Sequence, residues 1–230
     1  MFLVKGDVSG IQDFIFNVNS KGAARSLKGR SFFIKILLEV AMQKVFDACN
    51  ITTEEEKEAT KVSTSGGNFI LQLPVVTTET IDAIQLSLST ALRYTGLNIM
   101  LQCEEIEEGY KEAFTRLNQK IRKRKYELLM GETSFFEPFD RSKISGVNAN
   151  NRWIQITSQL KNKSHFAVNK DNEKDTDELV IGGKHIYLAG YQVSFGDQGI
   201  AIDKYLESVS PTGKTFEELA KWGGVDNNPK

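Results

Sequence analysis

The sequence has few of the residues that build disulfide scaffolds and metal centres. Its 230 residues include two cysteines and two histidines. Cys49 and Cys103 lie far apart and belong to no C-x-x-C pair, which excludes a disulfide framework and a cysteine-based zinc site and suits a reducing cytosol. With only His165 and His185, a histidine-rich metal centre is excluded as well.

Long apolar runs and an excess of one charge are also missing. No apolar run reaches the ~18 residues that a membrane span requires, and the first residues do not combine a charged leader with a long apolar stretch, as a secretory signal would. We therefore expect a cytoplasmic protein with no membrane contact. The 29 basic and 30 acidic residues give a net charge of -1, so only a local basic patch could bind nucleic acid.

Residues 1–130 alternate strand and helix patterns. Apolar residues at helical spacing predict helices, and a Gly-Gly pair between two short β-prone runs predicts a hairpin. The polar stretches 19–31 and 50–61 are expected to be loops. The order predicts an α+β fold with a ferredoxin-like, or Palm, antiparallel sheet and helices on one face. The expected strands are 2–8, 62–66, 69–74 and 97–103, and the expected helices are 9–18, 31–48, 79–94 and 109–127.

Residues 131–230 carry a weaker signal and are expected to form an appended α/β region. Three stretches are β-like, and a polar, charged stretch between them predicts a mobile loop. Short helices are expected near 203–207 and from Thr215. The β-like stretches are 153–160, 180–188 and 191–195, and the polar loop is 161–178.

The residues with the clearest chemical meaning are Asp7, at the end of the first strand, and the hairpin turn. In a Palm fold these positions lie side by side, and in nucleotidyl cyclases and polymerases both hold carboxylates that clamp two divalent cations. Here the hairpin carries the neutral Asn68. Asp7 could help to hold one Mg²⁺ through substrate phosphates, but the pair makes a poor two-metal centre.

We therefore predict a nucleotide-binding edge with Asp7 as its metal ligand. Glycine would let a nucleotide approach the backbone, and a helix starting at Ser9 would point its amides at a phosphate. Each residue also has a structural alternative: Asp7 as a turn cap, Ser9 with Gln12 as a helix capping box, and the glycines as a tight turn. The predicted edge comprises Asp7, Ser9, Gly10, Gly66, Gly67 and Asn68.

Two basic clusters are candidates for phosphate, RNA or partner contacts. The alternative for both is a solvated surface. The loop cluster, expected at a phosphate or a subunit contact, is Lys21, Arg25, Lys28 and Arg30; the helical cluster, expected to face RNA or a partner, is Arg122, Lys123, Arg124 and Lys125.

Three segments carry a specific resemblance. Residues 6–16, 20–32 and 66–69 read G-D-V-S-G-I-Q-D-F-I-F, S-K-G-A-A-R-S-L-K-G-R-S-F and G-G-N-F. They resemble the first of the two Palm domains in the large subunit of type III CRISPR effector complexes, over about residues 1–130. A weaker resemblance, over 179–222, is to the link towards the second Palm.

The resemblance implies a two-Palm enzyme of antiviral defence, in which the second Palm bears a G-G-D-D motif and makes cyclic oligoadenylates from ATP. The expected ligand is ATP with Mg²⁺, without zinc. The expected partners are a second Palm or other effector subunits, with crRNA or target RNA reached through the complex. This sequence holds no G-G-D-D motif and no zinc-binding cysteine pairs, and we expect no HD nuclease domain before Met1. We expect a split or truncated large subunit, or a first-Palm relative with another task.

Three functions remain open on the sequence. The first is a catalytically incomplete module that binds ATP weakly and acts in assembly. The second is a homodimeric nucleotidyltransferase making a nucleotide second messenger, with Asp13 or Asp226 replacing the missing carboxylate. The third is an interaction protein or decoy that mimics the large subunit.

Overall fold

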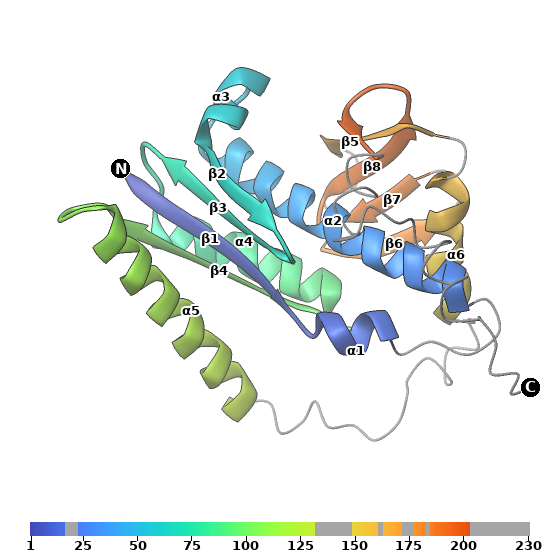
Figure 1. Cartoon of the computed structure of the whole chain (residues 1–230), viewed down its shortest axis with the longest axis horizontal. Coiled ribbons are helices and arrows are strands. Elements are labelled where there is room, and N and C mark those ends of the chain that lie inside the picture. Colours follow the sequence, from blue (N-terminus) through green and yellow to red (C-terminus); the bar gives the residue numbers. More distant parts are fainter. Residues whose placement is uncertain (17–22, 132–148, 161–162, 172–176, 183–184, 203–230) are drawn as a thin grey trace, which may run out of the picture.

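The computed structural model describes residues 1–16, 23–131, 149–160, 163–171, 177–182 and 185–202. Within them the chain forms two antiparallel sheets with a long helix between them (Figure 1). The helices predicted near 203–207 and from Thr215 lie outside the described residues.

The first sheet confirms the four strands predicted from the β-prone runs of the sequence. Neighbouring strands are antiparallel, in the order β2-β3-β1-β4, so β1 lies inside the sheet and β2 at its edge. The strands are β1 (Phe2–Ser9), β2 (Lys61–Ser65), β3 (Asn68–Leu73) and β4 (Asn98–Glu105).

Helices cover both faces of this sheet, so the prediction of helices on one face is wrong. Helices α2 (Ala23–Ala48) and α4 (Thr78–Leu92) share a core with Val4 and Val8 of β1, whereas Leu3 packs with α5 (Tyr110–Gly131) on the opposite face. Adjacent residues of a strand point to opposite faces. The burial of both Leu3 and Val4 therefore reflects two covered faces.

Helix α2 is longer than its apolar pattern predicted. Residues 23–31 were expected to be a loop because of their charges and glycines, but they form its first turns. Gly29 does not break the helix: it lets α2 approach α6 (Ala149–Leu160), because a β-carbon there would lie 1.9 Å from the carbonyl oxygen of Trp153. Most side chains of the later turns are buried on all sides, as expected of a helix enclosed by other elements.

The second sheet packs against α2 together with α6 and has the order β6-β7-β8-β5-β9. Two predictions fail here. Residues 153–160, expected to be β-like, are helical because Trp153, Ile156 and Leu160 share one buried face, and part of the expected 161–178 loop is a strand. The strands are β5 (His165–Lys170), β6 (Leu179–Gly182), β7 (His185–Leu188), β8 (Tyr191–Gly196) and β9 (Ile200–Ala201).

One continuous core joins the two sheets through α2. The ring centroids of Phe32 on α2 and Phe166 on β5 are 5.3 Å apart. Those of Phe14, on α1 (Ile11–Phe16), and Trp153 on α6 are 4.9 Å apart in an edge-on arrangement. Aromatic pairs of this kind contribute beyond their buried area. The two sheets therefore depend on the same helix.

Candidate functional site

The hairpin turn lies beside Asp7, as the sequence predicted. Gly66 and Gly67 join β2 to β3 with φ values of 60° and 89°, which side chains rarely allow. The amide of Val8 donates to the carbonyl of Gly67 at 2.9 Å, and Asp7 is directly opposite Asn68 in the β1–β3 register. Asp7, Asn68 and the turn thus form one edge of the sheet.

Asp7 forms an ion pair with α5. Its carboxylate lies on the sheet face that α5 covers, and its Oδ1 is 2.9 Å from the Nζ of Lys125. The two side chains are 24% and 32% exposed, respectively, so solvent reaches both. Asp7 is therefore an accessible strand residue with a cationic partner, and the turn-cap alternative is wrong.

Ser9 is not the helix cap that the sequence indicated. It is the last residue of β1 and is paired with Asn98. Helix α1 begins at Ile11, so Gly10 takes the cap position, and its carbonyl accepts from the amide of Phe14 at 2.9 Å. With only six residues, this helix offers little support for an anion site.

The carboxylates at this edge do not fit a two-metal centre. Asp7 already contacts Lys125, and its cross-strand partner Asn68 is neutral. Asp13, considered as a substitute, is exposed in the first turn of α1, and Asp226 lies outside the described residues. Within the described part of the chain, no three His, Cys, Asp or Glu residues gather in a way that could hold a metal ion.

The predicted basic loop does not form one surface. Arg25 is exposed, Lys28 is half-buried, and Lys21 lies outside the described residues. Arg30, predicted to lie at a phosphate or a subunit contact, is buried instead, with only 7% of it exposed. Its Nη1 donates to the carbonyl of Phe14 at 2.5 Å, and burial lowers the pKa of its guanidinium.

Aromatic rings explain why Arg30 is tolerated inside. Its guanidinium lies 5.4 Å from the ring centroid of Phe14 and 5.8 Å from that of Trp153. A planar, weakly hydrated cation between aromatic faces costs less to bury than an ammonium would. Arg30 therefore holds α1, α2 and α6 together, which sequence reasoning missed because Trp153 is distant in the chain.

Carboxylates partly neutralise the basic run on α5. Beyond the Lys125–Asp7 pair, Lys123 and Arg124 each lie 3.9 Å from a carboxylate, of Glu127 and Asp82 respectively, and Arg122 is exposed. The run thus provides less free positive charge than its sequence indicated, which weakens the prediction of an RNA surface.

One carboxylate on β4 fixes α5 against the sheet. Glu104 accepts from Arg116 at 2.6 Å and pairs with Lys120 at 2.5 Å. Burial alone would raise the pKa of Glu104, but the hydrogen bonds and charges of these two cations together lower it. Lys5 on β1 adds a 2.7 Å hydrogen bond to Asn118. These contacts determine where Lys125 reaches the sheet.

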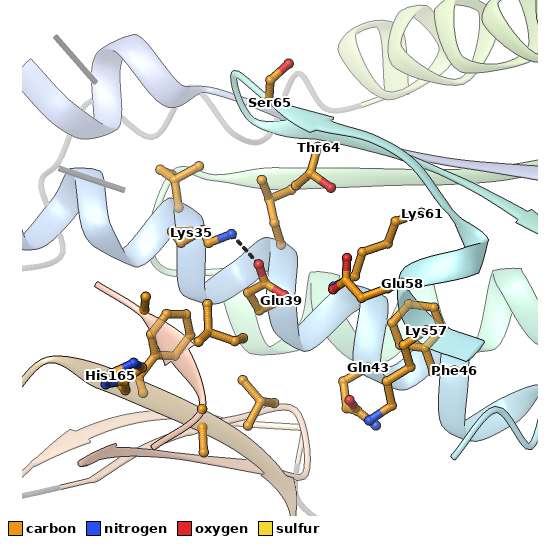
Figure 2. Close-up of a pocket in the computed structure, with 18 of the residues that line it drawn as sticks. Lys35, Glu39, Gln43, Phe46, Lys57, Glu58, Lys61, Thr64, Ser65 and His165 are labelled. Atoms are coloured by element: carbon orange, nitrogen blue, oxygen red, sulfur yellow. Dashed lines mark hydrogen bonds and ion pairs between the residues drawn. The ribbon is translucent and has the colours of Figure 1, made fainter. Parts of the chain in front are cut away.

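A cleft of about 1370 Å³ opens between the two sheets, which the sequence did not indicate. Helix α2 forms its floor, the β2 hairpin lies on one side, and His165 and its strand lie on the other (Figure 2). Gly66 and Gly67 line it, but Asp7 and Asn68 do not. The turn therefore separates the cleft from the Asp7 edge.

The charged groups in the cleft are largely paired among themselves. Lys57 pairs with Glu54 at 2.7 Å and Lys61 with Glu58 at 2.6 Å, and Lys35 pairs with Glu39 on the floor. Such pairs leave little net charge to attract an anion. The cleft is therefore a weaker candidate for phosphate binding than the Asp7 edge.

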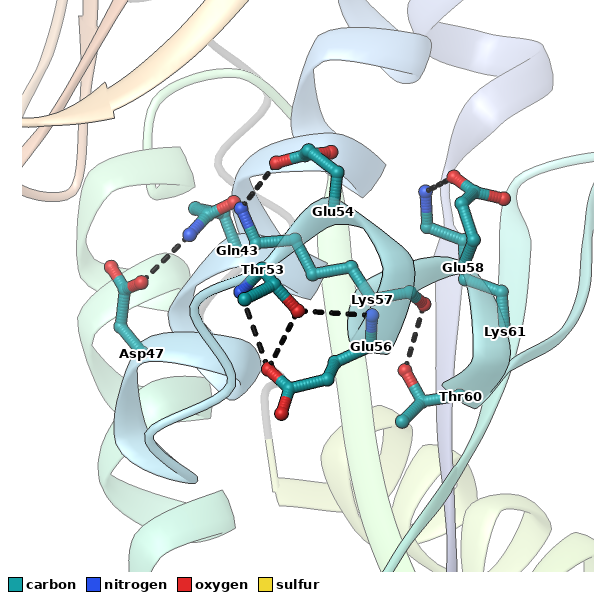
Figure 3. A network of polar contacts seen from close by, with 9 residues as sticks. All are labelled: Gln43, Asp47, Thr53, Glu54, Glu56, Lys57, Glu58, Thr60 and Lys61. Carbon is teal, nitrogen blue, oxygen red and sulfur yellow. Dashed lines mark hydrogen bonds and ion pairs between the residues drawn. The ribbon is translucent and has the colours of Figure 1, made fainter.

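The residues expected to form the 50–61 loop contain helix α3 (Glu54–Thr60). Thr53 and Glu56 form a complete capping box, in which the amide of Glu56 donates to the Thr53 hydroxyl at 3.2 Å (Figure 3). The T-x-x-E pattern is a sequence signal for a helix start. This pattern predicts the helix, whereas the acidic charge of the segment alone indicated a loop.

None of the described helices is long and apolar enough to cross a membrane. This agrees with the missing apolar runs in the sequence.

Comparisons with known proteins agree with the sequence resemblance. The family model described as Csm1 subunit domain B matches residues 1–141. Two curated relatives are subtype III-A single-strand-specific deoxyribonucleases of the CRISPR system, Cas10/Csm1. The one from Methanocaldococcus jannaschii is 45% identical over 49 residues, or 21% of this chain and 6% of the relative. The one from Enterococcus italicus is 38% identical over 72 residues, which are 31% of this chain and 9% of the relative.

Solved structures share the fold over most of the chain. A Csm1–Csm4 subcomplex of the type III-A CRISPR–Csm interference complex matches with a TM-score of 0.61 and 19% identity, covering 86% of this chain and 26% of that one. Csm1 of T. onnurineus matches with a TM-score of 0.54 and 20% identity, covering 86% and 24%. This chain thus spans about a quarter of these solved relatives, and its alignments cover under a tenth of the two curated ones.

Proposed function

This chain belongs to the Csm1 subunit domain B family, and we propose that it is the first-Palm module of a type III-A CRISPR large subunit. In this proposal it binds ATP weakly at the edge formed by Asp7, Asn68 and the Gly66-Gly67 turn. It needs a second Palm to complete the site, and it acts in assembly of the antiviral effector. RNA is reached only through that assembly.

The strand order supports the Palm interpretation. An antiparallel β2-β3-β1-β4 sheet with α2 and α4 on one face follows the order of a ferredoxin-like unit. Helix α5 on the other face is an addition to that unit.

The juxtaposition of Asp7 with the hairpin turn is the single observation that carries the nucleotide proposal. In Palm enzymes the polyphosphate lies at the end of the first strand and the hairpin tip. Solved relatives include a Csm1–Csm4 cassette in complex with one ATP. By analogy, other effector subunits of the Csm4 kind are the partners that we propose for this chain.

Calorimetry of the full chain with ATP tests the binding step. We expect a dissociation constant of roughly 0.1–1 mM, or about -5.5 to -4.1 kcal/mol, because half of the site would come from a second Palm. Gly67→Val should weaken binding, since its φ is 89° and a β-carbon would lie 2.3 Å from Ile11. Gly109→Ala is a matched control, because its φ is also positive but it precedes α5, outside the proposed edge.

Thermal melts of all three proteins separate loss of the site from loss of the fold. A folded wild-type chain that gives no binding signal at millimolar ATP would overturn the nucleotide proposal. The interaction-protein reading would then be the best remaining account.

A product assay distinguishes this proposal from the nucleotidyltransferase alternative. The isolated chain should make no cyclic oligoadenylate from ATP with Mg²⁺ or Mn²⁺, because the second carboxylate is missing at Asn68. Oligoadenylate that is formed by the wild type and lost in Asp7→Ala would favour the homodimeric enzyme instead.

A further inference from the structure

The edge at Asp7 has a built-in cation where a Palm enzyme would hold a metal. Lys125 extends from α5 to the sheet face, and its ammonium is 2.9 Å from the Asp7 carboxylate. The cross-strand partner Asn68 carries no charge. One carboxylate already paired with an ammonium is a poor ligand for a divalent ion, because the two cations would compete for it.

The position of Lys125 is fixed by contacts along α5. Lys5 binds Asn118 at 2.7 Å, and Glu104 binds Arg116 at 2.6 Å, both towards the N-terminal end of the helix from Lys125. Leu3 packs with Ala113 and Leu117 between the helix and the sheet. The ammonium is therefore held at the edge by a helix docked at several points.

We propose that Lys125 replaces the metal ion at this edge and that its ammonium, while still paired with Asp7, holds the polyphosphate of a nucleotide directly. An ammonium carries three N–H donors, and the contact with Asp7 uses one. Both side chains are partly exposed, so a phosphate reaches the ammonium without displacing the carboxylate. Nucleotide binding is then independent of divalent cations.

This inference rests on the proposed function for the identity of the ligand, but its electrostatics can be tested separately. A metal site and a lysine site predict opposite effects of Asp7→Asn. If Asp7 ligates a metal, the substitution weakens binding in Mg²⁺. If Lys125 binds the phosphate, the substitution removes a nearby negative charge that repels the phosphate, and binding becomes stronger in EDTA.

The experiment titrates the full chain with ATP and with inorganic triphosphate, each in EDTA and in Mg²⁺. We expect wild-type affinities in the two conditions to agree within about twofold. Lys125→Met should weaken the binding of both ligands by ~5–10-fold, because it removes a charge-assisted hydrogen bond. Asp7→Asn should strengthen binding in EDTA by ~3-fold, since a nearby negative charge is lost.

Lys123→Met is the matched control. Lys123 lies on the same helix two residues away, is 80% exposed, and its Nζ is 3.9 Å from the carboxylate of Glu127. Its substitution should leave both affinities within about twofold of wild type. Equal losses in the two lysine variants would overturn the inference, because binding would then reflect the general charge of α5.

Two further outcomes separate this inference from the proposed function. Binding of triphosphate but not ATP would refute the nucleotide function and leave Lys125 as an anion site. Binding of ATP that requires Mg²⁺ and is lost in Asp7→Asn would refute the role of Lys125 and leave the proposed function intact. Absence of binding of either ligand would overturn both.

Discussion

The two faces of the first sheet differ in how they are covered. On one face, α2 and α4 bury a continuous apolar layer that includes Val4, Leu71 and Leu101. On the other face, α5 buries a smaller apolar cluster of Leu3, Ile70, Ala113 and Leu117, its Ile121 is buried as well, and polar contacts such as Lys5–Asn118 and Glu104–Arg116 also hold it. The first face carries most of the stability, and the second can carry charged, solvent-accessible groups for binding.

The largest expected effect comes from deleting apolar volume on the α2 face. Leu71 is fully buried there, and its neighbour Ile70 belongs to the small cluster under α5. Leu71→Ala should lower the free energy of unfolding by about 4 kcal/mol, and Ile70→Ala by about 2 kcal/mol, within the range for such truncations. Urea denaturation of the two variants measures both. Equal losses of unfolding free energy in the two variants would contradict the inference that the α2 face contributes more stability than the α5 face.

A smaller and pH-dependent effect is expected on the α5 face. Glu104→Gln should cost about 1–2 kcal/mol at pH 7, because two charge-assisted hydrogen bonds lose their anionic acceptor. The pKa of Glu104 is lowered in the folded protein. Its stabilising effect is therefore fully present above the unfolded pKa of about 4.3 and is lost as the pH falls through the folded pKa.

Urea unfolding at pH 7, 5 and 3 tests the sign of this effect. The gap between wild type and Glu104→Gln should shrink as the pH falls. Glu108, which lies 3.4 Å from Arg116 and is 72% exposed, supplies the control: Glu108→Gln should change stability little at any of these pH values. A difference in unfolding free energy between wild type and Glu104→Gln that grows as the pH falls would refute the stabilising role of the ionised Glu104.

The smallest effect on stability is expected at the proposed binding edge itself. Lys125→Met and Asp7→Asn remove a partly exposed ion pair, and each should change the free energy of unfolding by less than about 0.5 kcal/mol. Large changes in ligand affinity with unchanged melting would then place binding on the face that does not hold the fold together. A loss of several kcal/mol in either variant would make the pair structural instead.

The sequence predicted those elements whose signals are local. Runs of β-prone residues identified the four strands of the first sheet, and the Gly66-Gly67 pair identified the hairpin, because both signals lie within a few residues of the chain. Helix α6 was missed because its β-prone residues become helical only when Trp153 and Ile156 pack against α2. The N-terminal turns of α2 were missed for the same reason, since Gly29 has its function only opposite α6.

The candidate site was predicted in its parts but not in its arrangement. Asp7 and Lys125 were both identified, one as a metal ligand and one as part of an RNA or partner surface. No local pattern places α5 across the face of β1, so their 2.9 Å contact could not be foreseen. Arg30 was expected at the surface because charge usually indicates exposure, yet Phe14 and Trp153 provide it with an aromatic environment.

The burial of α2 between the two sheets has a consequence for biosynthesis. During translation, β1, α2 and the rest of the first sheet are synthesised before α6 and the second sheet. The side of α2 that bears Phe32 therefore remains exposed to solvent until Phe166 and the strands of the second sheet have been synthesised. A nascent chain that ends before α6 should bind chaperones that recognise exposed apolar surface, through this side of α2. In the finished protein the helix is shared by both halves, so its backbone amides should exchange with solvent only when the whole molecule unfolds.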